Sequence, residues 1–248
     1  MIEARHISLT FGDNKVLDDI SFSFEVGKTN LIIGQSGSGK TVLVKSLVGL
    51  LTPDEGEIMY DNRDFIAMSN RERRELRQEI GMLFQGGALF DSMTVEQNVM
   101  FPLNMFTKMT PAEKLDRVNF CLERVNLAGR NKLMPSELSG GMIKRVAIAR
   151  AISLNPKYLF CDEPNSGLDP ITSGVIDELI KEITEDFNTT TVINTHDMNS
   201  VLMIGENIAF IYKGKIGWRG TRHEILHSDN EELNEFIFAT ELTRRLKR

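Results

Sequence analysis

The segment at residues 34–41 reads Gly-Gln-Ser-Gly-Ser-Gly-Lys-Thr, which matches the spacing G-x-x-x-x-G-K-[ST] of a phosphate-binding loop. A short apolar, β-branched run at residues 29–33 precedes it, and residues 42–51 are apolar at helical spacing. In this order of strand, glycine loop and helix, backbone N–H groups at a helix N-terminus bind a polyphosphate. A glycine-rich turn that only caps a helix is the alternative, but the flanking strand and helix favour nucleotide binding.

Each residue type in this loop has an expected role. Glycines let consecutive backbone N–H groups turn towards the phosphates, where the helix dipole already favours negative charge. We expect Lys40 to reach the β- and γ-phosphates and the Thr41 hydroxyl to bind Mg²⁺. The residues expected to contact the nucleotide phosphates are Gly34, Ser36, Gly37, Ser38, Gly39, Lys40 and Thr41.

The composition is that of a globular protein. With 248 residues, of which 41% are hydrophobic and 26% charged, the chain can form one large α/β domain with a smaller subdomain. The net charge of −6 argues against broad nucleic-acid binding, because neutralising phosphates requires a basic surface. Two cysteines are too few for a disulfide framework and favour a reducing compartment. Because we find neither a long apolar span nor a signal peptide, we expect a soluble cytoplasmic chain that reaches a membrane only through a partner.

Two adjacent carboxylates end a second predicted strand. Residues 158–161 are apolar, and Asp162 and Glu163 follow them directly. Like charges side by side at the end of a sheet are unfavourable without a cation. In a chain with a phosphate loop, we therefore predict that Asp162 contributes to a Mg²⁺ site and that Glu163 is the base that polarises a water molecule. The alternative is two solvated acids in a turn.

Polar residues also follow two other predicted strands. Gln85 comes after the apolar residues 80–84, and His196 comes after residues 190–195. Ligands of open α/β sheets bind at the carboxyl ends of the strands, so both side chains are candidate site residues. The alternative for His196 is a purely structural role, which is usual for a lone histidine.

The sequence between Gly86 and about Leu154 has a helical pattern. Capping boxes begin at Thr94 and Thr110, and Ser139 followed by two glycines begins a third helix. The Ser-Gly-Gly turn is a second candidate anion site at a helix N-terminus, or an ordinary cap. An apolar stripe made of Leu115, Val118, Leu122 and Val125 is expected in the core. One face of a later helix is expected to carry Val175, Ile176, Leu179, Ile180 and Ile183.

A hairpin is predicted near the N-terminus, and a second hairpin followed by two helices is predicted near the C-terminus. Residues 7–11 and 20–24 alternate around a turn, which indicates an antiparallel start. Residues 208–220 form a second predicted hairpin. Capping boxes at Thr221 and Ser228 then predict two terminal helices, with an apolar side made of Leu233, Phe236, Ile237, Leu242 and Leu246.

As a set, these residues resemble the ATP-binding-cassette family, the ATPase subunits of ABC transporters, over essentially the whole chain. The resemblance implies that Phe11 stacks on the adenine of ATP and that residues 34–41 are the Walker A loop. Gln85 would be the Q-loop residue, which senses Mg²⁺ and the membrane partner. His196 would be the switch histidine, and residues 158–162 the Walker B strand, with Glu163 as the catalytic base.

Two further motifs complete the resemblance. Residues 138–142 would be the signature motif, in which Ser139, Gly140 and Gly141 contact phosphate, and residues 166–169 would be the D-loop, with Asp169 also at the nucleotide. The sequence departs from the usual pattern in two places: Met142 stands where glutamine is usual, and the adenine stacker is phenylalanine rather than tyrosine. Neither change removes a phosphate contact, so we expect an active ATPase.

The family has an α/β fold, and the resemblance implies it for this chain. It consists of a RecA-like P-loop ATPase core with an N-terminal antiparallel β-subdomain and an inserted α-helical signature subdomain. We divide the single ABC ATPase domain, residues 1–248, into a core with β-subdomain at residues 1–85 and 155–220, a helical subdomain at 86–154 and a C-terminal helical extension at 221–248.

A narrower resemblance concerns residues 84–103 and the methionine-ended signature. Both are similar to the Mla-type ATPases of Gram-negative bacteria, which drive phospholipid movement between the membranes. The resemblance implies ATP and Mg²⁺ as cofactors and a homodimer with head-to-tail ATP sites, in which the signature of one chain closes on ATP held by the other. It also implies a peripheral position on the cytoplasmic face of the inner membrane. The implied partners are a permease docked near residues 87–106, an MCE-domain protein reached through the permease and a small cytoplasmic regulator, but no nucleic acid.

Three other functions are open at this stage. An ABC ATPase for another cargo, such as an amino acid or a metal, has the same motifs, since cargo contacts the permease. A non-transport ABC protein of DNA repair or translation would need a coiled-coil insertion, zinc modules or tandem cassettes, for which the segment between Gln85 and Leu138 is short. A nucleotide-regulated scaffold without turnover would not require Glu163 and His196. The transport direction and the exact lipid are not encoded in these motifs.

Overall fold

The computed structural model describes residues 1–238, and its central element is a mostly parallel sheet. Strands β9, β3, β8, β7 and β6 are parallel neighbours, and β10 pairs antiparallel with β9 at one edge. Every residue of β3, β7 and β8 is buried, as expected when helices or a second layer cover both faces. The strands span Thr29–Ile33 (β3), Ile80–Leu83 (β6), Tyr158–Asp162 (β7), Thr190–Asn194 (β8), Asn207–Tyr212 (β9) and Lys215–Gly220 (β10).

A smaller antiparallel sheet is formed by the N-terminal strands, in the order β2-β1-β4-β5. The predicted hairpin is therefore confirmed, with Phe11 paired to Asn14 at its tip. Ile7, Leu9, Ile20, Phe22 and Phe24 all contribute to the core. The strands span Ile2–Phe11 (β1), Asn14–Phe24 (β2), Glu55–Tyr60 (β4) and Arg63–Asp64 (β5).

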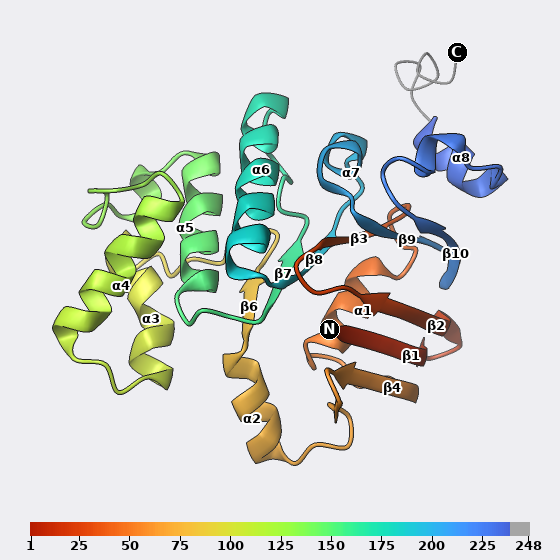
Figure 1. Cartoon of the computed structure of the whole chain (residues 1–248), viewed down its shortest axis with the longest axis horizontal. Helices are drawn as coiled ribbons and strands as arrows, with labels where there is room; N and C mark the ends of the chain where they lie inside the picture. Colours follow the sequence, from red (N-terminus) through yellow and green to blue (C-terminus); the bar gives the residue numbers. More distant parts are fainter. Residues whose placement is uncertain (239–248) are drawn as a thin grey trace.

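The helices are unevenly distributed around the two sheets. Helices α3 to α5 gather at one end of the molecule and the antiparallel sheet lies at the other, with α6 between them (Figure 1). The helices span Lys40–Leu47 (α1), Asn70–Gln78 (α2), Val95–Phe106 (α3), Pro111–Arg124 (α4), Gly140–Ile152 (α5), Pro170–Phe187 (α6), Met198–Ile204 (α7) and Glu231–Ile237 (α8), with 3-10 turns at Pro135–Glu137 (η1) and Ile225–His227 (η2).

The side chains of the parallel strands divide between two hydrophobic clusters. Leu31 and Ile33 of β3 pack with helices α3 to α6, whereas Ile32 packs with α1 and the antiparallel sheet. This alternation is the period-2 pattern of a strand that is buried on both faces. Both hydrophobic clusters therefore pack against strands β3, β6, β7 and β8. The candidate site residues follow the carboxyl ends of these strands.

Local signals predicted the helix starts well. The hydroxyls of Thr94 and Thr110 each accept a hydrogen bond from the N–H of the third helical residue, and each threonine donates its own backbone N–H to the side chain of that residue, so both capping boxes are present. Ser139 likewise caps α5. Within residues 1–238, no helix has the length and apolar character needed to cross a bilayer.

Some predicted boundaries and burial assignments were wrong. Helix α1 ends at Leu47 rather than Leu51, because Gly49 takes a φ of 74° and stops it. Leu115 is 38% exposed because the buried face of α4 begins only at Val118. On the predicted apolar face of α6, Ile176 and Leu179 are buried, whereas Val175 is 51% exposed at its edge.

The structure also differs from the two predicted terminal helices. Thr221 and Glu224 do form their capping bonds, but a 3-10 turn follows instead of an α-helix. Helix α8 is capped by Asn230, whose Oδ1 accepts from the Leu233 N–H at 2.7 Å, and not by Ser228. Leu242 and Leu246, which were predicted to lie on the apolar side of the terminal helices, are outside the described residues. The division into subdomains stays a prediction.

Candidate functional site

The glycines of the loop between β3 and α1 are required by its geometry. Gly34, Gly37 and Gly39 have φ values of 149°, 79° and 107°, which side-chain-bearing residues rarely adopt. A Cβ atom at Gly34 would lie 2.4 Å from the Ile211 carbonyl oxygen. Gly39 is the N-cap of α1 and offers no side-chain acceptor to the first turn. The first N–H groups of α1 are therefore left for a ligand with acceptor oxygens.

Two polar side chains are buried in this loop. Lys40 is 6% exposed, and its Nζ donates to the carbonyl oxygens of Gly34 and Gln35 at 2.9 Å each. Burial lowers the pKa of Lys40, while the nearby Glu163 and Asp162 act in the opposite direction. The hydroxyl of Ser38 is buried, and no partner for it is found among the described residues. A buried hydroxyl without a partner is unfavourable and fits a loop that closes around an oxygen-rich group.

One amide brings two expected metal ligands together. Nδ2 of Asn194, the last residue of β8, donates to Thr41 Oγ1 at 3.1 Å and to Asp162 Oδ1 at 2.6 Å. Two oxygens that share one donor are also close enough to share one cation, and hydroxyl and carboxylate oxygens suit Mg²⁺. We did not predict a role for Asn194, although a polar residue at the end of an apolar strand was a signal for one.

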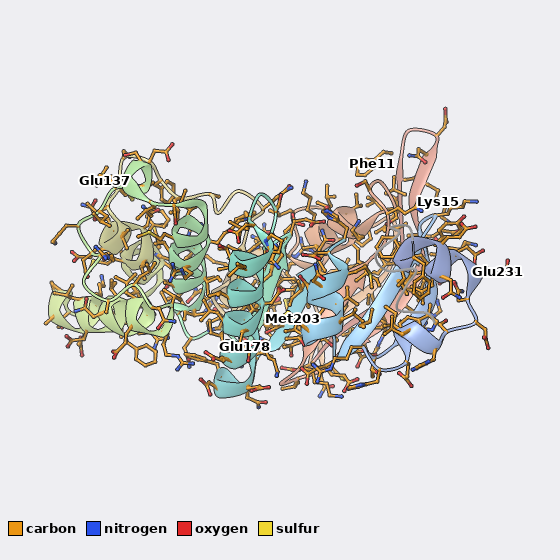
Figure 2. All side chains as sticks on the ribbon, turned by 90° about the horizontal axis from the view of Figure 1, so that it is seen from above. Phe11, Lys15, Glu137, Glu178, Met203 and Glu231 are labelled. Carbon is orange, nitrogen blue, oxygen red and sulfur yellow. The ribbon has the colours of Figure 1, made fainter. Side chains whose placement is uncertain are left out.

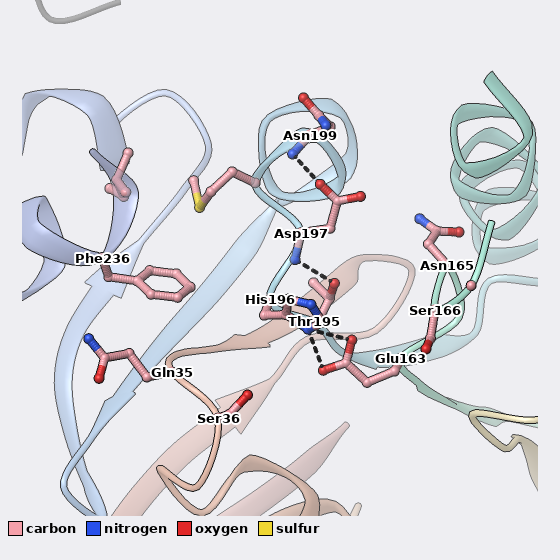
Figure 3. A pocket seen from close by; sticks show the side chains of 13 residues that line it. Gln35, Ser36, Glu163, Asn165, Ser166, Thr195, His196, Asp197, Asn199 and Phe236 are labelled. Atoms are coloured by element: carbon pink, nitrogen blue, oxygen red, sulfur yellow. Dashed lines mark hydrogen bonds and ion pairs between the residues drawn. The ribbon is translucent and has the colours of Figure 1, made fainter. Parts of the chain in front are cut away.

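Glu163 and His196 contact each other in the wall of the cavity beside the loop (Figure 3). His196 Nδ1 lies 2.9 Å from Glu163 Oε1 and 2.8 Å from Oε2. The Glu163 side chain is 14% exposed and that of His196 is 61% exposed. Glu163 has a φ of 48°, an uncommon conformation that concentrates at functional sites. The cavity of about 670 Å³ is also lined by Gln35 and Ser36 of the loop.

Gln85 and its backbone connect this cavity to α5. Gln85 Nε2 donates to Ser166 Oγ at 3.3 Å. Nζ of Lys144, a buried residue of α5, donates to the Gln85 carbonyl oxygen and lies 3.5 Å from the Glu163 carbonyl oxygen. Burial lowers the pKa of Lys144. We did not predict a role for Lys144, although a lysine within the apolar part of α5 was a visible signal.

Arg150 attaches the other end of α5 to the segment that follows Gln85. Its guanidinium donates to the carbonyl oxygens of Ala88 and Gly87 at 2.7 and 2.8 Å. Side chains of α5 are therefore hydrogen-bonded to the backbone on both sides of Gly86.

The Ser-Gly-Gly turn lies against α6 and does not line the cavity. Ser139 Oγ accepts from the Met142 N–H at 3.3 Å. A Cβ atom at Gly141 would lie 2.6 Å from Thr172 Cγ2, so glycine is needed for this close packing. Gly140 lies next to Leu168. Asp169 caps α6 by accepting from the N–H groups of Ile171 and Thr172 at 3.0 Å.

Phe11 is also remote from the Ser-Gly-Gly turn. It is 50% exposed at the tip of the β1–β2 hairpin. Figure 2 shows Phe11 at one end of the molecule and Glu137, two residues before Ser139, at the other. The described structure thus brings together the loop, Gln85, Asp162, Glu163 and His196, but keeps Ser139, Gly140 and Gly141 away from Phe11.

Known proteins resemble this chain in sequence and in structure. The family model for ABC transporters matches residues 17–166. The Haemophilus influenzae intermembrane phospholipid transport system ATP-binding protein MlaF is 40% identical over 237 residues, which cover 96% of this chain and 90% of that protein. The Mycobacterium leprae protein named "Probable ribonucleotide transport ATP-binding protein mkl" is 38% identical over 236 residues, covering 95% of this chain and 68% of its own length. A dimeric structure of the ATP-binding cassette MJ0796 in a post-hydrolysis state, bound to ADP and Pi, matches with a TM-score of 0.81 and 30% identity, covering 90% of this chain and 99% of that one.

Proposed function

The chain belongs to the ABC transporter ATP-binding family, and from this premise we propose that it powers phospholipid transport between the two membranes of a Gram-negative bacterium. ATP hydrolysis is the reaction of the family. The observation that supports specific roles for residues is the contact between Glu163 and His196 beside the glycine loop. The phospholipid cargo is supported by the similarity to MlaF.

The proposed hydrolysis uses the side chains around the cavity. The loop and Lys40 bind the phosphates of ATP. Thr41 and Asp162, with Gln85 as a further ligand, would hold Mg²⁺, and the metal would neutralise charge on the phosphate oxygens. Glu163 accepts a proton from the attacking water at a carboxylate oxygen, and His196 orients that carboxylate. Lys40 must exchange its present carbonyl acceptors for phosphate oxygens when ATP binds.

Glu163→Gln tests the role of the base. The amide keeps the shape of the side chain but cannot accept the proton, so we expect turnover to fall by about 10²–10⁴-fold. Binding of ATP, measured by calorimetry, should remain within a few-fold of the wild type. Steady-state turnover equal to that of the wild type would remove Glu163 from this role.

We further propose a head-to-tail homodimer, in which Ser139, Gly140, Gly141 and Asp169 of one chain act at the ATP of the other. Phe11, the proposed adenine contact, lies at the opposite end of the molecule from the Ser-Gly-Gly turn (Figure 2). One nucleotide cannot contact both ends of one chain, whereas two chains arranged head to tail bring the two ends together. The structure of MJ0796 is dimeric, which supports a dimer by similarity.

Mixed dimers test this pairing. When a Lys40→Ala chain is combined with a Ser139→Arg chain, one composite site is intact and the other carries both changes. Turnover per mixed dimer should therefore exceed that of either mutant homodimer and approach half the wild-type value. If both sites must hydrolyse together, ATP binding at the intact site still distinguishes the two arrangements. A mixed dimer with no high-affinity ATP site would contradict pairing between chains.

The segment at residues 87–106 is the proposed dock for a permease. Val99 and Leu103 of α3 are buried, but Phe90 and Phe106 are each 40% exposed. Both line a hollow of about 300 Å³ together with Phe101 and β6. An apolar hollow of this kind fits a helix of a membrane partner. The permease would hold the chain at the cytoplasmic face of the inner membrane and connect it to an MCE-domain protein. A small cytoplasmic regulator is a further proposed partner.

Charged substitutions test the dock. Phe90→Glu and Phe106→Glu should abolish copurification with the permease while leaving basal ATP turnover within about twofold of the wild type, because neither residue lines the catalytic cavity. Phe120→Glu is the matched control, since Phe120 is 42% exposed on α4 and does not line the hollow. Equal loss of permease in the control would contradict a dock at this position.

The mycobacterial relative supports a second cargo. Its name refers to ribonucleotide transport, and its identity to this chain is nearly as high as that of MlaF. The complex reconstituted in vesicles decides between the two cargoes. Movement of labelled phospholipid on addition of ATP supports the proposal, and movement of a ribonucleotide, amino acid or metal without phospholipid overturns it.

A further inference from the structure

A buried polar cluster lies directly beneath the catalytic cavity. Asn165 follows β7, Asp177 lies in α6 and Ser200 lies in α7, and their side chains meet. Asn165 Nδ2 donates to Asp177 Oδ1 at 2.8 Å and to Ser200 Oγ at 2.9 Å. Asp177 is 1% exposed and Ser200 is fully buried. Three separate elements are thus joined by one set of hydrogen bonds.

The cluster joins the two segments that carry Glu163 and His196. Asn165 is two residues after Glu163 and directly precedes Ser166, which accepts a hydrogen bond from Gln85. Helix α7 begins two residues after His196. The hydrogen bonds of the cluster therefore connect the segment that carries Glu163 to the segment that carries His196. Figure 3 shows Asn165 and Ser166 on the side of Glu163 that faces away from His196.

An acid is an unfavourable choice for so buried a position if packing were its only purpose. Burial raises the pKa of Asp177 to about 6, and the charge of Asp197 adds to the effect, while hydrogen bonds from Ser200 and Asn165 oppose it. Burial raises the pKa of the neighbouring Cys161 thiol, so this side chain stays neutral and adds no second negative charge. A buried carboxylate that accepts two hydrogen bonds fixes both donors more firmly than a neutral group does.

We propose that Asp177 is a positioning residue for ATP hydrolysis, which holds Asn165 and Ser200 so that Glu163 and His196 keep their contact. The proposal rests on the roles assigned above to Glu163 and His196. Asp177 does not line the cavity and acts only through the segments that it joins. It therefore affects the rate of the chemical step and not the binding of ATP.

The test compares three single variants in the full-length chain. Asp177→Leu has the same branched arrangement of side-chain heavy atoms and removes both acceptor oxygens, so we expect kcat to fall about tenfold with the KM for ATP within about twofold, since small misplacements of reacting groups reduce rates strongly. Asp177→Asn keeps an acceptor for Asn165 and should retain at least about half of the wild-type kcat. Thr184→Val is the control, because Thr184 lies in the same helix, is fully buried and bonds to Thr191 far from the cavity. It should lower stability and leave kcat unchanged.

Coupling between the partners gives a second readout. Asn165→Ala alone should lower kcat, and in combination with Asp177→Leu the loss should be no greater than that of the more severe single variant. If Asp177→Leu does not fold, Asn165→Ala and Ser200→Ala carry the test, with an expected loss in kcat of about three- to tenfold each.

The proposal is overturned if kcat is unchanged in these variants while Glu163→Gln is inactive, and in that case the roles of the catalytic residues remain supported. It is also overturned by an equal loss of kcat in Thr184→Val, or by a rise in KM without a fall in kcat. Normal turnover in Glu163→Gln would instead overturn the assignment of the base, and this inference with it.

Discussion

Two helices of this protein begin at glycine-rich turns, and the two turns leave their backbone donors in different states. Before α1, Gly39 has a φ of 107° and offers no side chain, and Lys40 and the Ser38 hydroxyl are buried nearby. Before α5, Ser139 caps the helix with its own hydroxyl, and Ser139 and Gly140 are exposed. The backbone donors before α1 are thus available to a ligand, whereas one backbone donor at the start of α5 is already hydrogen-bonded to Ser139.

The difference shows how one chain can carry two anion sites of unequal strength. The loop before α1 contains positive φ angles and buried polar groups, which reduce stability until a phosphate occupies it. The turn before α5 stabilises its own helix and presents few donors on an open surface. In the proposed dimer, a phosphate would reach this turn only from the nucleotide held by the other chain.

The largest expected effect is the pH dependence of the free energy of unfolding that Asp177 causes. The pKa of Asp177 is raised to about 6 from 3.8, so the folded state binds more protons than the unfolded state between these values. Stability should therefore fall as pH rises from about 4 to above 6, by up to about 3 kcal/mol. Asp177→Asn should remove this fall, which urea unfolding of both proteins at pH 5 and pH 8 will measure. Parallel pH dependence in the two proteins would contradict the raised pKa.

Next in size is the effect of Lys40→Ala on nucleotide binding. Losing a charge-assisted contact to phosphate should weaken ATP binding by about 1.5–3 kcal/mol. Titration calorimetry of the monomeric chain will measure it. Lys45→Ala, a change in the same helix away from the loop, is the control and should bind ATP as the wild type does.

Equivalent glycine substitutions test the two turns directly. Gly39→Ala places a methyl group 2.8 Å from the Val16 carbonyl oxygen at a positive φ and should destabilise the loop by about 1–3 kcal/mol, with loss of ATP binding. At Gly140 the new methyl group would lie 3.4 Å from Leu168 Cδ2 within a regular helix, so Gly140→Ala should leave the melting temperature and ATP binding of the monomer nearly unchanged. Similar losses at both positions would erase the difference between the turns.

The smallest effect is expected at the cap of α5. Ser139→Ala removes the acceptor for the Met142 N–H and should reduce the free energy of unfolding by about 1 kcal/mol. Chemical denaturation will measure the change, and Ser139→Asn, which can still cap the helix, should restore most of it. A loss of ATP binding by the monomer in Ser139→Ala would place this turn at the chain's own nucleotide and contradict the proposed dimer.

Most of the fold follows from signals that are local in the sequence. The strands around the loop, the first hairpin and the capped starts of α3, α4 and α5 were all predicted, because alternation and capping residues act over a few neighbouring positions. The exposed Leu115 and Val175 were not predicted, because helical periodicity identifies a face but not how far a neighbour covers it.

The sequence by itself determined the phosphate loop, the acidic end of β7 and the family, because each depends on residue types at fixed spacing along the chain. Only the tertiary structure decided that the Asn194 amide joins Thr41 to Asp162 and that Asn165, Asp177 and Ser200 form one cluster. It also decided that Lys144 reaches the Gln85 carbonyl oxygen. These contacts join residues that are distant in sequence. Their partners are chosen by the order of the parallel strands and the packing of α5 to α7, which no local pattern encodes.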